Sequence, residues 1–125
     1  MLRWTGVCLD CTDPEGLAEF YARLLGWEVT HRSDDWYQLR APDGGVGLNI
    51  QGDPRFEPPV WPEEPGRPGK QMHFEIEVDD VPAAVDRATT CGAVEAPWQP
   101  PDRDRDRLRV MLDPAGHPFC LYDDS

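Results

Sequence analysis

Apolar and polar residues alternate near the start of the chain, and the spacing then becomes helical. Val7, Leu9 and Cys11 form the apolar half of the alternation, which is typical of a strand with two different faces. The apolar residues that follow recur three or four positions apart, at Leu17, Phe20, Tyr21, Leu24 and Leu25. The pattern predicts a strand and then a helix, with Asp13 as the N-cap and Gly26 as the C-terminal stop.

The same order returns in the second half of the chain. Residues 71–79 alternate again and precede helical spacing over residues 81–91, with Asp80 as the expected N-cap. Three shorter strand patterns follow each helix, near residues 27–33, 35–41 and 46–51 and again near 93–98, 107–113 and 117–122. One supersecondary unit is therefore used twice, which places the functional site where the two copies face each other. We predict an α+β fold built from two βαβββ modules.

With 125 residues, the chain is long enough for a single domain with its own hydrophobic core. Module one is expected over about residues 1–52 and module two over about residues 71–125. Residues 53–70, between them, are rich in proline, which excludes a helix or a central strand. The apolar residues of this linker, among them Trp61, predict that it packs as an arm.

Charge and composition narrow the functional classes. A net charge of −12 argues against nucleic acid as a partner, because phosphate binding needs a basic face, and it is compatible with a cationic ligand.

No long apolar run or signal-peptide pattern occurs, so we expect no membrane span and a cytoplasmic protein with reduced cysteines. Cys8 and Cys11 have CxxC spacing, but an offset of three in a strand puts them on opposite faces. The charge alternation of residues 102–107 predicts a solvated hairpin tip.

Strand parity assigns one set of side chains to the sheet face opposite the helices. Phe74 and Ile76 take the helix side, so His73 and Glu75 take the other. The same parity selects Cys8, Asp10, Asn49, Gln51, Glu77, Arg109, Met111, Cys120 and Tyr122, and Trp36 lies within expected reach of them. Buried polar groups need hydrogen-bond partners, so this set predicts a ligand cavity. The alternative is that Arg109 pairs with a carboxylate and water fills the remaining space.

Three motifs give the chain a resemblance to a known superfamily. They are Phe20-Tyr21 followed by Leu24-Leu25-Gly26-Trp27, His73 with Val78-Asp79-Asp80, and Asp113-Pro114-Ala115-Gly116-His117-Pro118-Phe119. In this order they make the chain resemble the vicinal-oxygen-chelate superfamily, which includes glyoxalase I, bleomycin-resistance proteins and extradiol dioxygenases. It looks most like the glyoxalase-like domain proteins of that superfamily. The resemblance covers the whole chain and implies a curved mixed sheet with a central cup for a ligand or metal.

The resemblance also implies where a metal would be held. The matching positions are Gly6, Asn49 or Gln51 depending on register, His73 and Cys120. Glycine offers no ligand and a neutral amide is a poor one, so only His73 suits a hard or borderline divalent ion. We therefore expect neither a bound metal nor another cofactor, with a divalent metal as the alternative.

The expected function is metal-independent binding of a cationic or aromatic small molecule, as in bleomycin resistance, by a homodimer. One alternative is a lyase, isomerase or dioxygenase of the same superfamily that uses His73 as a catalytic residue and a divalent metal. The sequence is also compatible with zinc bound by Cys8, His73 and Cys120, with a Cys120 nucleophile activated by His73, and with an accessory module that binds no ligand.

Overall fold

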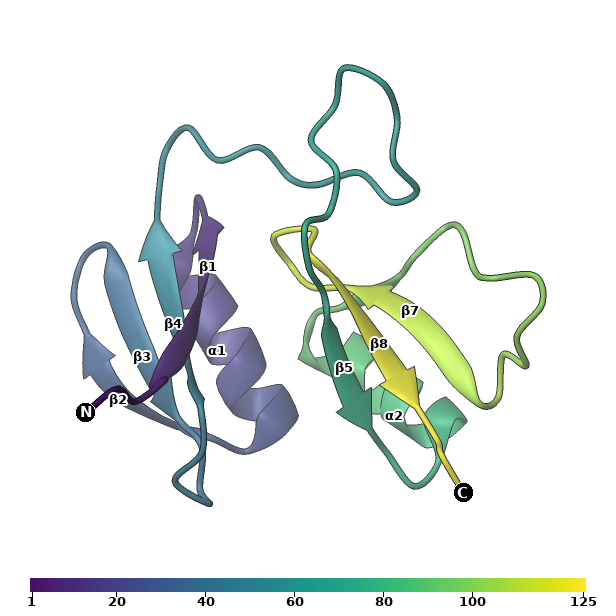
Figure 1. Ribbon diagram of the computed structural model, residues 1–125, viewed down its shortest axis with the longest axis horizontal. Helices are drawn as coiled ribbons and strands as arrows, with labels where there is room; N and C mark the ends of the chain where they lie inside the picture. Colours follow the sequence, from purple (N-terminus) through teal and green to yellow (C-terminus); the bar gives the residue numbers. More distant parts are fainter. The chain divides into compact units, whose positions relative to one another are not determined.

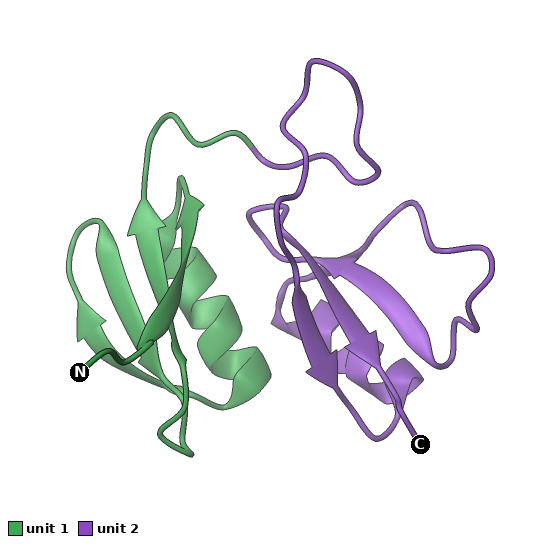
Figure 2. Ribbon diagram, viewed as in Figure 1, with its two compact units in different colours: residues 1–57 green, residues 58–125 purple.

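The computed structural model describes all 125 residues. The chain forms two compact units, residues 1–57 and residues 58–125 (Figure 2). Most of the proline-rich linker belongs to the second unit.

The first unit contains one helix and a four-stranded sheet (Figure 1). Its elements are β1 (Gly6–Cys11), α1 (Pro14–Leu25), β2 (Glu28–Arg32), β3 (Trp36–Arg40) and β4 (Gly47–Gly52). The strand order is β1-β4-β3-β2, in which β1 is parallel to β4 and the other pairs are antiparallel.

The second unit repeats this arrangement. Its elements are β5 (Phe74–Glu77), α2 (Val81–Cys91), β6 (Val94–Glu95), β7 (Leu108–Leu112) and β8 (Pro118–Tyr122). The order β5-β8-β7-β6 pairs β5 parallel with β8, as β1 pairs with β4 in the first unit. Both sheets are open and mixed, so the predicted α+β class and the two βαβββ modules are confirmed. The central cup stays a prediction.

Both helices begin and end as the sequence predicts. The Asp13 carboxylate accepts a hydrogen bond from the Gly16 amide at 3.0 Å, and Asp80 accepts one from the Ala83 amide at 3.1 Å. These bonds satisfy amide groups that the first helical turn leaves without a partner. Gly26 follows α1 with φ 70°, a left-handed conformation that a Cβ atom disfavours.

Each helix packs on one face of the sheet in its own unit. In the first unit the fully buried side chains of α1, such as Phe20 and Tyr21, lie with Leu39 of β3 and Ile50 of β4 in the core. In the second unit the core contains Val81, Ala88, Met111, Phe119 and Leu121. Neither helix is long and apolar enough to cross a membrane.

The structure corrects two predicted strands and one predicted face. The first strand of module two begins only at Phe74, so His73 precedes it, and the predicted strand at 93–98 is reduced to Val94–Glu95. Strand parity predicts Arg109 and Met111 on the open face. They pair with Leu121 and Phe119, so they lie on the helix side instead.

The face prediction failed because β7 is apolar on both sides. Met111 is fully buried in the core, whereas Val110 is equally buried on the opposite face. An alternation between polar and apolar residues is absent from this strand, so parity alone could not choose between its faces. The Arg109 guanidinium reaches the Glu95 carboxylate at 3.3 Å and the Arg105 carbonyl at 2.8 Å, outside the core.

Candidate functional site

Polar and apolar side chains form rows across the open face of the second sheet, opposite α2. Because paired residues on neighbouring strands share a face, Glu75, Cys120 and Val110 make one row. The next row consists of Glu77, Tyr122 and Leu108. Carboxylates therefore lie on β5, a thiol and a phenol on β8, and aliphatic groups on β7.

The linker covers the apolar part of this face. Ala96, Val110 and Cys120 form a buried cluster, and Trp61 packs against it. The segment that carries Trp61 is closed by a hydrogen bond from the Val60 amide to the Pro68 carbonyl at 2.7 Å. The prediction that the linker packs as an arm is confirmed for this segment.

Trp61 is also the centre of an aromatic group. Its ring centroid lies 5.9 Å from that of His73, edge to face, and 5.9 Å from that of Trp98. The Lys70 ammonium lies 4.2 Å from the Trp61 ring centroid, and it also contacts Glu63 at 2.7 Å. A cation over an aromatic face is attracted to it electrostatically. The open face thus combines aromatic, cationic and acidic groups within the second unit.

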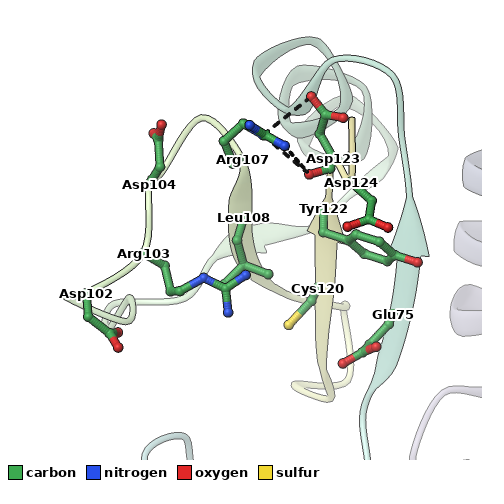
Figure 3. Close-up of a pocket in the computed structure, with 10 residues that line it drawn as sticks. All are labelled: Glu75, Asp102, Arg103, Asp104, Arg107, Leu108, Cys120, Tyr122, Asp123 and Asp124. Carbon is green, nitrogen blue, oxygen red and sulfur yellow. Dashed lines mark hydrogen bonds and ion pairs between the residues drawn. The ribbon is translucent and has the colours of Figure 1, made fainter.

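A hollow of about 390 Å³ lies in the same unit and is lined in part by Cys120 (Figure 3). Cys120 and Leu108 form the apolar floor of the hollow. The charged residues that line it around them carry five carboxylates and two guanidinium groups. The lining residues are Glu75, Asp102, Arg103, Asp104, Arg107, Leu108, Cys120, Tyr122, Asp123 and Asp124. The excess of carboxylates makes the hollow favourable for a cation.

The two guanidinium groups of the hollow differ in their partners. Arg107 contacts the Asp123 carboxylate at 3.7 Å and the Asp123 carbonyl at 3.2 Å, and it also binds the carbonyl of Ser125. The Arg103 side chain has no such partner within the second unit and extends toward Cys120 (Figure 3). Arg107 therefore fastens the C-terminal segment, whereas Arg103 remains available.

Burial and nearby carboxylates favour the neutral forms of Cys120 and Tyr122. Burial raises the pKa of the Cys120 thiol, the Glu75 carboxylate raises it further, and Arg103 and Lys70 partly oppose both effects. The pKa of Tyr122 is raised by desolvation and then by Glu77, with which its hydroxyl group also forms a hydrogen bond. At neutral pH the site therefore presents a thiol and a phenol, and a neutral thiol is a poor nucleophile and metal ligand.

His73 lies at the edge of the same face. Its Nε2 atom is 3.6 Å from Glu75 Oε1, which is too long for a hydrogen bond but close enough for an ion pair when the imidazole is protonated. The Glu75 side chain is 68% exposed, so solvent screens this pair strongly. The contact can orient the imidazole without fixing its tautomer.

The first unit presents a more polar open face. Trp36, Gln51 and Asp10 form one cross-strand row, and Gln38, Asn49 and Cys8 form the next. The Gln38 amide donates to Asn49 Oδ1 at 3.3 Å. The predicted residues of module one therefore share the open face of one sheet.

The Asn49 side chain lies directly beside Gly6, which itself offers no metal ligand. A Cβ atom on Gly6 would lie 2.9 Å from Asn49 Nδ2, so the Asn49 amide occupies the space that a side chain at Gly6 would need. A second hollow, of about 270 Å³, is lined by Asn49, by other neutral residues such as Thr30 and Gln38, and by Arg40.

The donor set does not fit the metal site that the superfamily resemblance implies. Gly6 has no side chain, Asn49 and Gln51 offer neutral amides, and Cys120 is a buried thiol with a raised pKa. Nowhere do three His, Cys, Asp or Glu side chains gather in a way that could hold an ion. A divalent ion prefers carboxylate or imidazole ligands to these groups.

Sequence reasoning missed several residues of the hollow. Arg103 and Arg107 belong to a charge-alternating segment, and the prediction of a solvated tip accounts for its exposure but not for its place beside Cys120. Charge alternation cannot show which side chains of a loop turn inward. Trp98 and Lys70, which contact Trp61 and do not line the hollow, were also missed, because both lie outside the helices and strands and follow no periodic pattern.

The sequence matches one family model, described as a glyoxalase-like domain, over residues 6–122. No curated protein matches the chain.

Several solved structures are similar in fold. An enzyme of the glyoxalase/bleomycin resistance protein/dioxygenase family from Burkholderia phytofirmans PsJN is 18% identical, with 98% of each chain covered and a TM-score of 0.69. The genomically encoded fosfomycin resistance protein FosX from Listeria monocytogenes is 13% identical, with 100% of this chain and 95% of that chain covered and a TM-score of 0.70. The antibiotic binding protein TnmS3 from Streptomyces sp. CB03234 is 19% identical, with 100% and 98% covered and a TM-score of 0.63.

Proposed function

Because the chain belongs to the glyoxalase-like domain family, we propose that it binds a cationic, partly aromatic small molecule without a metal ion. The observation that carries this proposal is the hollow of the second unit, where Leu108 and Cys120 lie beside the Glu75 carboxylate and Trp61 packs against the cluster that contains Cys120. Two of the ten lining residues, Leu108 and Cys120, give the hollow an apolar floor, and the charged residues around them can orient a ligand.

Binding of this kind needs no reacting group. The Glu75 carboxylate attracts the cationic part of the ligand, while Leu108, Cys120 and the nearby Trp61 and Trp98 offer apolar and aromatic surface. The neutral thiol of Cys120 adds to this surface without attacking the ligand. The protein then acts by mass action and lowers the free concentration of its ligand.

The similar structures support the proposal only at the level of the fold. One of them is a fosfomycin resistance protein and another is an antibiotic binding protein, so this fold serves drug resistance and drug binding in those two cases. The fold also serves enzymes, and fold alone does not decide between the two uses.

A second candidate function rests on the contact between His73 and Glu75. A carboxylate 3.6 Å from an imidazole can stabilise the imidazolium that forms when the histidine accepts a proton, as a general base requires. The catalytic hypothesis predicts that His73→Gln abolishes turnover of a bound ligand. The binding hypothesis predicts that His73→Gln changes affinity alone.

We also propose that the protein is a homodimer. The superfamily resemblance supports this proposal. Light scattering of the purified protein should give about twice the chain mass of 14.2 kDa, and a mass equal to that of one chain would contradict the proposal.

The binding proposal is tested with two dyes that share a xanthene ring system. The methyl ester of a rhodamine is a cation and fluorescein is an anion, and fluorescence anisotropy reports the binding of either. The cation should bind saturably and the anion at least tenfold more weakly. Glu75→Gln should weaken cation binding by about threefold, because an exposed ion pair contributes less than about 1 kcal/mol.

Glu64→Gln is the matched control, because Glu64 is exposed in the same unit and does not line the hollow. It should leave both affinities unchanged. Equal binding of the two dyes, or equal effects of the two variants, would contradict the proposal.

A further inference from the structure

The charged segment between β6 and β7 presents its residues to different sides. In Figure 3 the carboxylates of Asp102 and Asp104 point away from the hollow, whereas the guanidinium between them points into it. The segment is shaped by turns, including hydrogen bonds from the Arg103 amide to the Pro100 carbonyl and from the Arg107 amide to the Asp104 carbonyl. The backbone therefore separates the acidic side chains from the basic one.

Arg103 is distinguished from its basic neighbours by the lack of a protein partner. Arg105 binds Glu95, Arg107 binds Asp123, and Arg109 binds both Glu95 and the Arg105 carbonyl. The Arg103 guanidinium forms no ion pair within the second unit. Its donors are therefore free to bind a group from solution.

The hollow has an opposite charge on its other wall. Glu75 reaches in from β5, and the Cys120 sulfur lies between the Glu75 carboxylate and the Arg103 guanidinium in the view of Figure 3. Both charges act on that sulfur, Glu75 raising the pKa of the thiol and Arg103 lowering it. A positive and a negative group thus face each other across an apolar floor.

We propose that the hollow selects a dipolar ligand, in which a carboxylate binds Arg103 and a cationic group binds Glu75. The planar guanidinium matches the two oxygens of a carboxylate, which favours this anion over a single acceptor. The inference rests on the proposed function and adds the requirement that the ligand also carries a carboxylate. A purely cationic ligand would leave Arg103 without a partner and would be repelled by its positive charge.

The test compares a rhodamine free acid with its methyl ester by fluorescence anisotropy. The two dyes share the cationic ring system and differ by one methyl group, which removes the negative charge of the carboxylate. The wild-type protein should bind the free acid about tenfold more tightly, the effect of one charge-assisted hydrogen bond in a partly exposed site. Arg103→Gln should abolish this preference by weakening the free acid alone.

Arg105→Gln is the matched control, because it removes the same charge two residues away, outside the hollow. It should preserve the preference for the free acid. The dipolar assignment is overturned if wild-type protein binds both dyes equally, or if Arg103→Gln weakens both alike, while saturable binding of the ester still supports the proposed function. If neither dye binds, both proposals are contradicted.

Discussion

The pKa of the Cys120 thiol depends on the charged side chains around it. Its thiol is buried, and its pKa is raised by burial and by Glu75 and lowered by Arg103 and Lys70. A raised pKa favours the neutral thiol, so Cys120 should react slowly with alkylating agents until the pH exceeds the ordinary thiol value. The same shift stabilises the folded state below that value, and this stability is lost as the pH rises through the folded pKa.

Two substitutions should move the pKa of Cys120 in opposite directions. Arg103→Gln removes a group that lowers it and should shift the midpoint of iodoacetamide labelling to higher pH. Glu75→Gln removes a group that raises it and should shift the midpoint to lower pH. Peptide mass spectrometry assigns the label to Cys120 rather than to the other three cysteines. Unchanged midpoints in both variants would contradict this arrangement of charges around the thiol.

At the residue scale, the glycine and the aspartate at the ends of a helix could be identified from the sequence, because both act on the local backbone. Gly26 and Asp13 were identified as the limits of the first helix from local chemistry alone, and the structure places them there. Arg103 could not be identified in this way, since the direction of a long side chain depends on turns and on neighbours distant in the sequence.

At the scale of elements, the proline-rich arm is a structural part of the second unit. Trp61 packs on the Val110 and Cys120 cluster and contacts Trp98 and His73. Its indole nitrogen is buried without a hydrogen-bond partner. The Trp61 ring therefore stabilises the fold by packing, whereas burial of its unpaired N–H group costs free energy.

Trp61→Ala should destabilise the protein by about 3 kcal/mol, because it removes a large aromatic group and leaves a cavity. Trp61→Phe should cost about 1 kcal/mol or less, because it keeps an aromatic ring and removes the unsatisfied donor. Urea unfolding measures both, with Trp98→Ala as the comparison, since Trp98 is 40% exposed. A cost for Trp61→Ala no larger than that of Trp98→Ala would contradict the packing role of Trp61.

The elements themselves were largely predictable. Strand parity placed Glu75 and Cys120 on one face correctly because β5 and β8 are anchored by apolar residues on the other face, such as Phe74 and Phe119. It failed for β7, which is apolar on both sides, and there the pairing with β8 decides the face. The sequence does not show how β7 pairs with β8, and this pairing was needed to assign the faces of β7.

At the scale of the whole molecule, the repeat produces two similar units with different open faces. The first carries amides, and Asn49 fills the space beside Gly6. The second carries carboxylates and aromatic groups around Cys120. The two units share a fold while their faces differ, so function follows the side chains rather than the fold.

Metal-independent binding without turnover can be tested by a single titration. The cationic rhodamine methyl ester is titrated into wild-type protein with and without a chelator, and the dye is recovered afterwards for mass spectrometry. We predict saturable binding with the same affinity under both conditions and recovery of the dye unchanged. Loss of binding in the chelator would show that a metal ion is required, and recovery of a converted product would show turnover, so either result would contradict the proposed function.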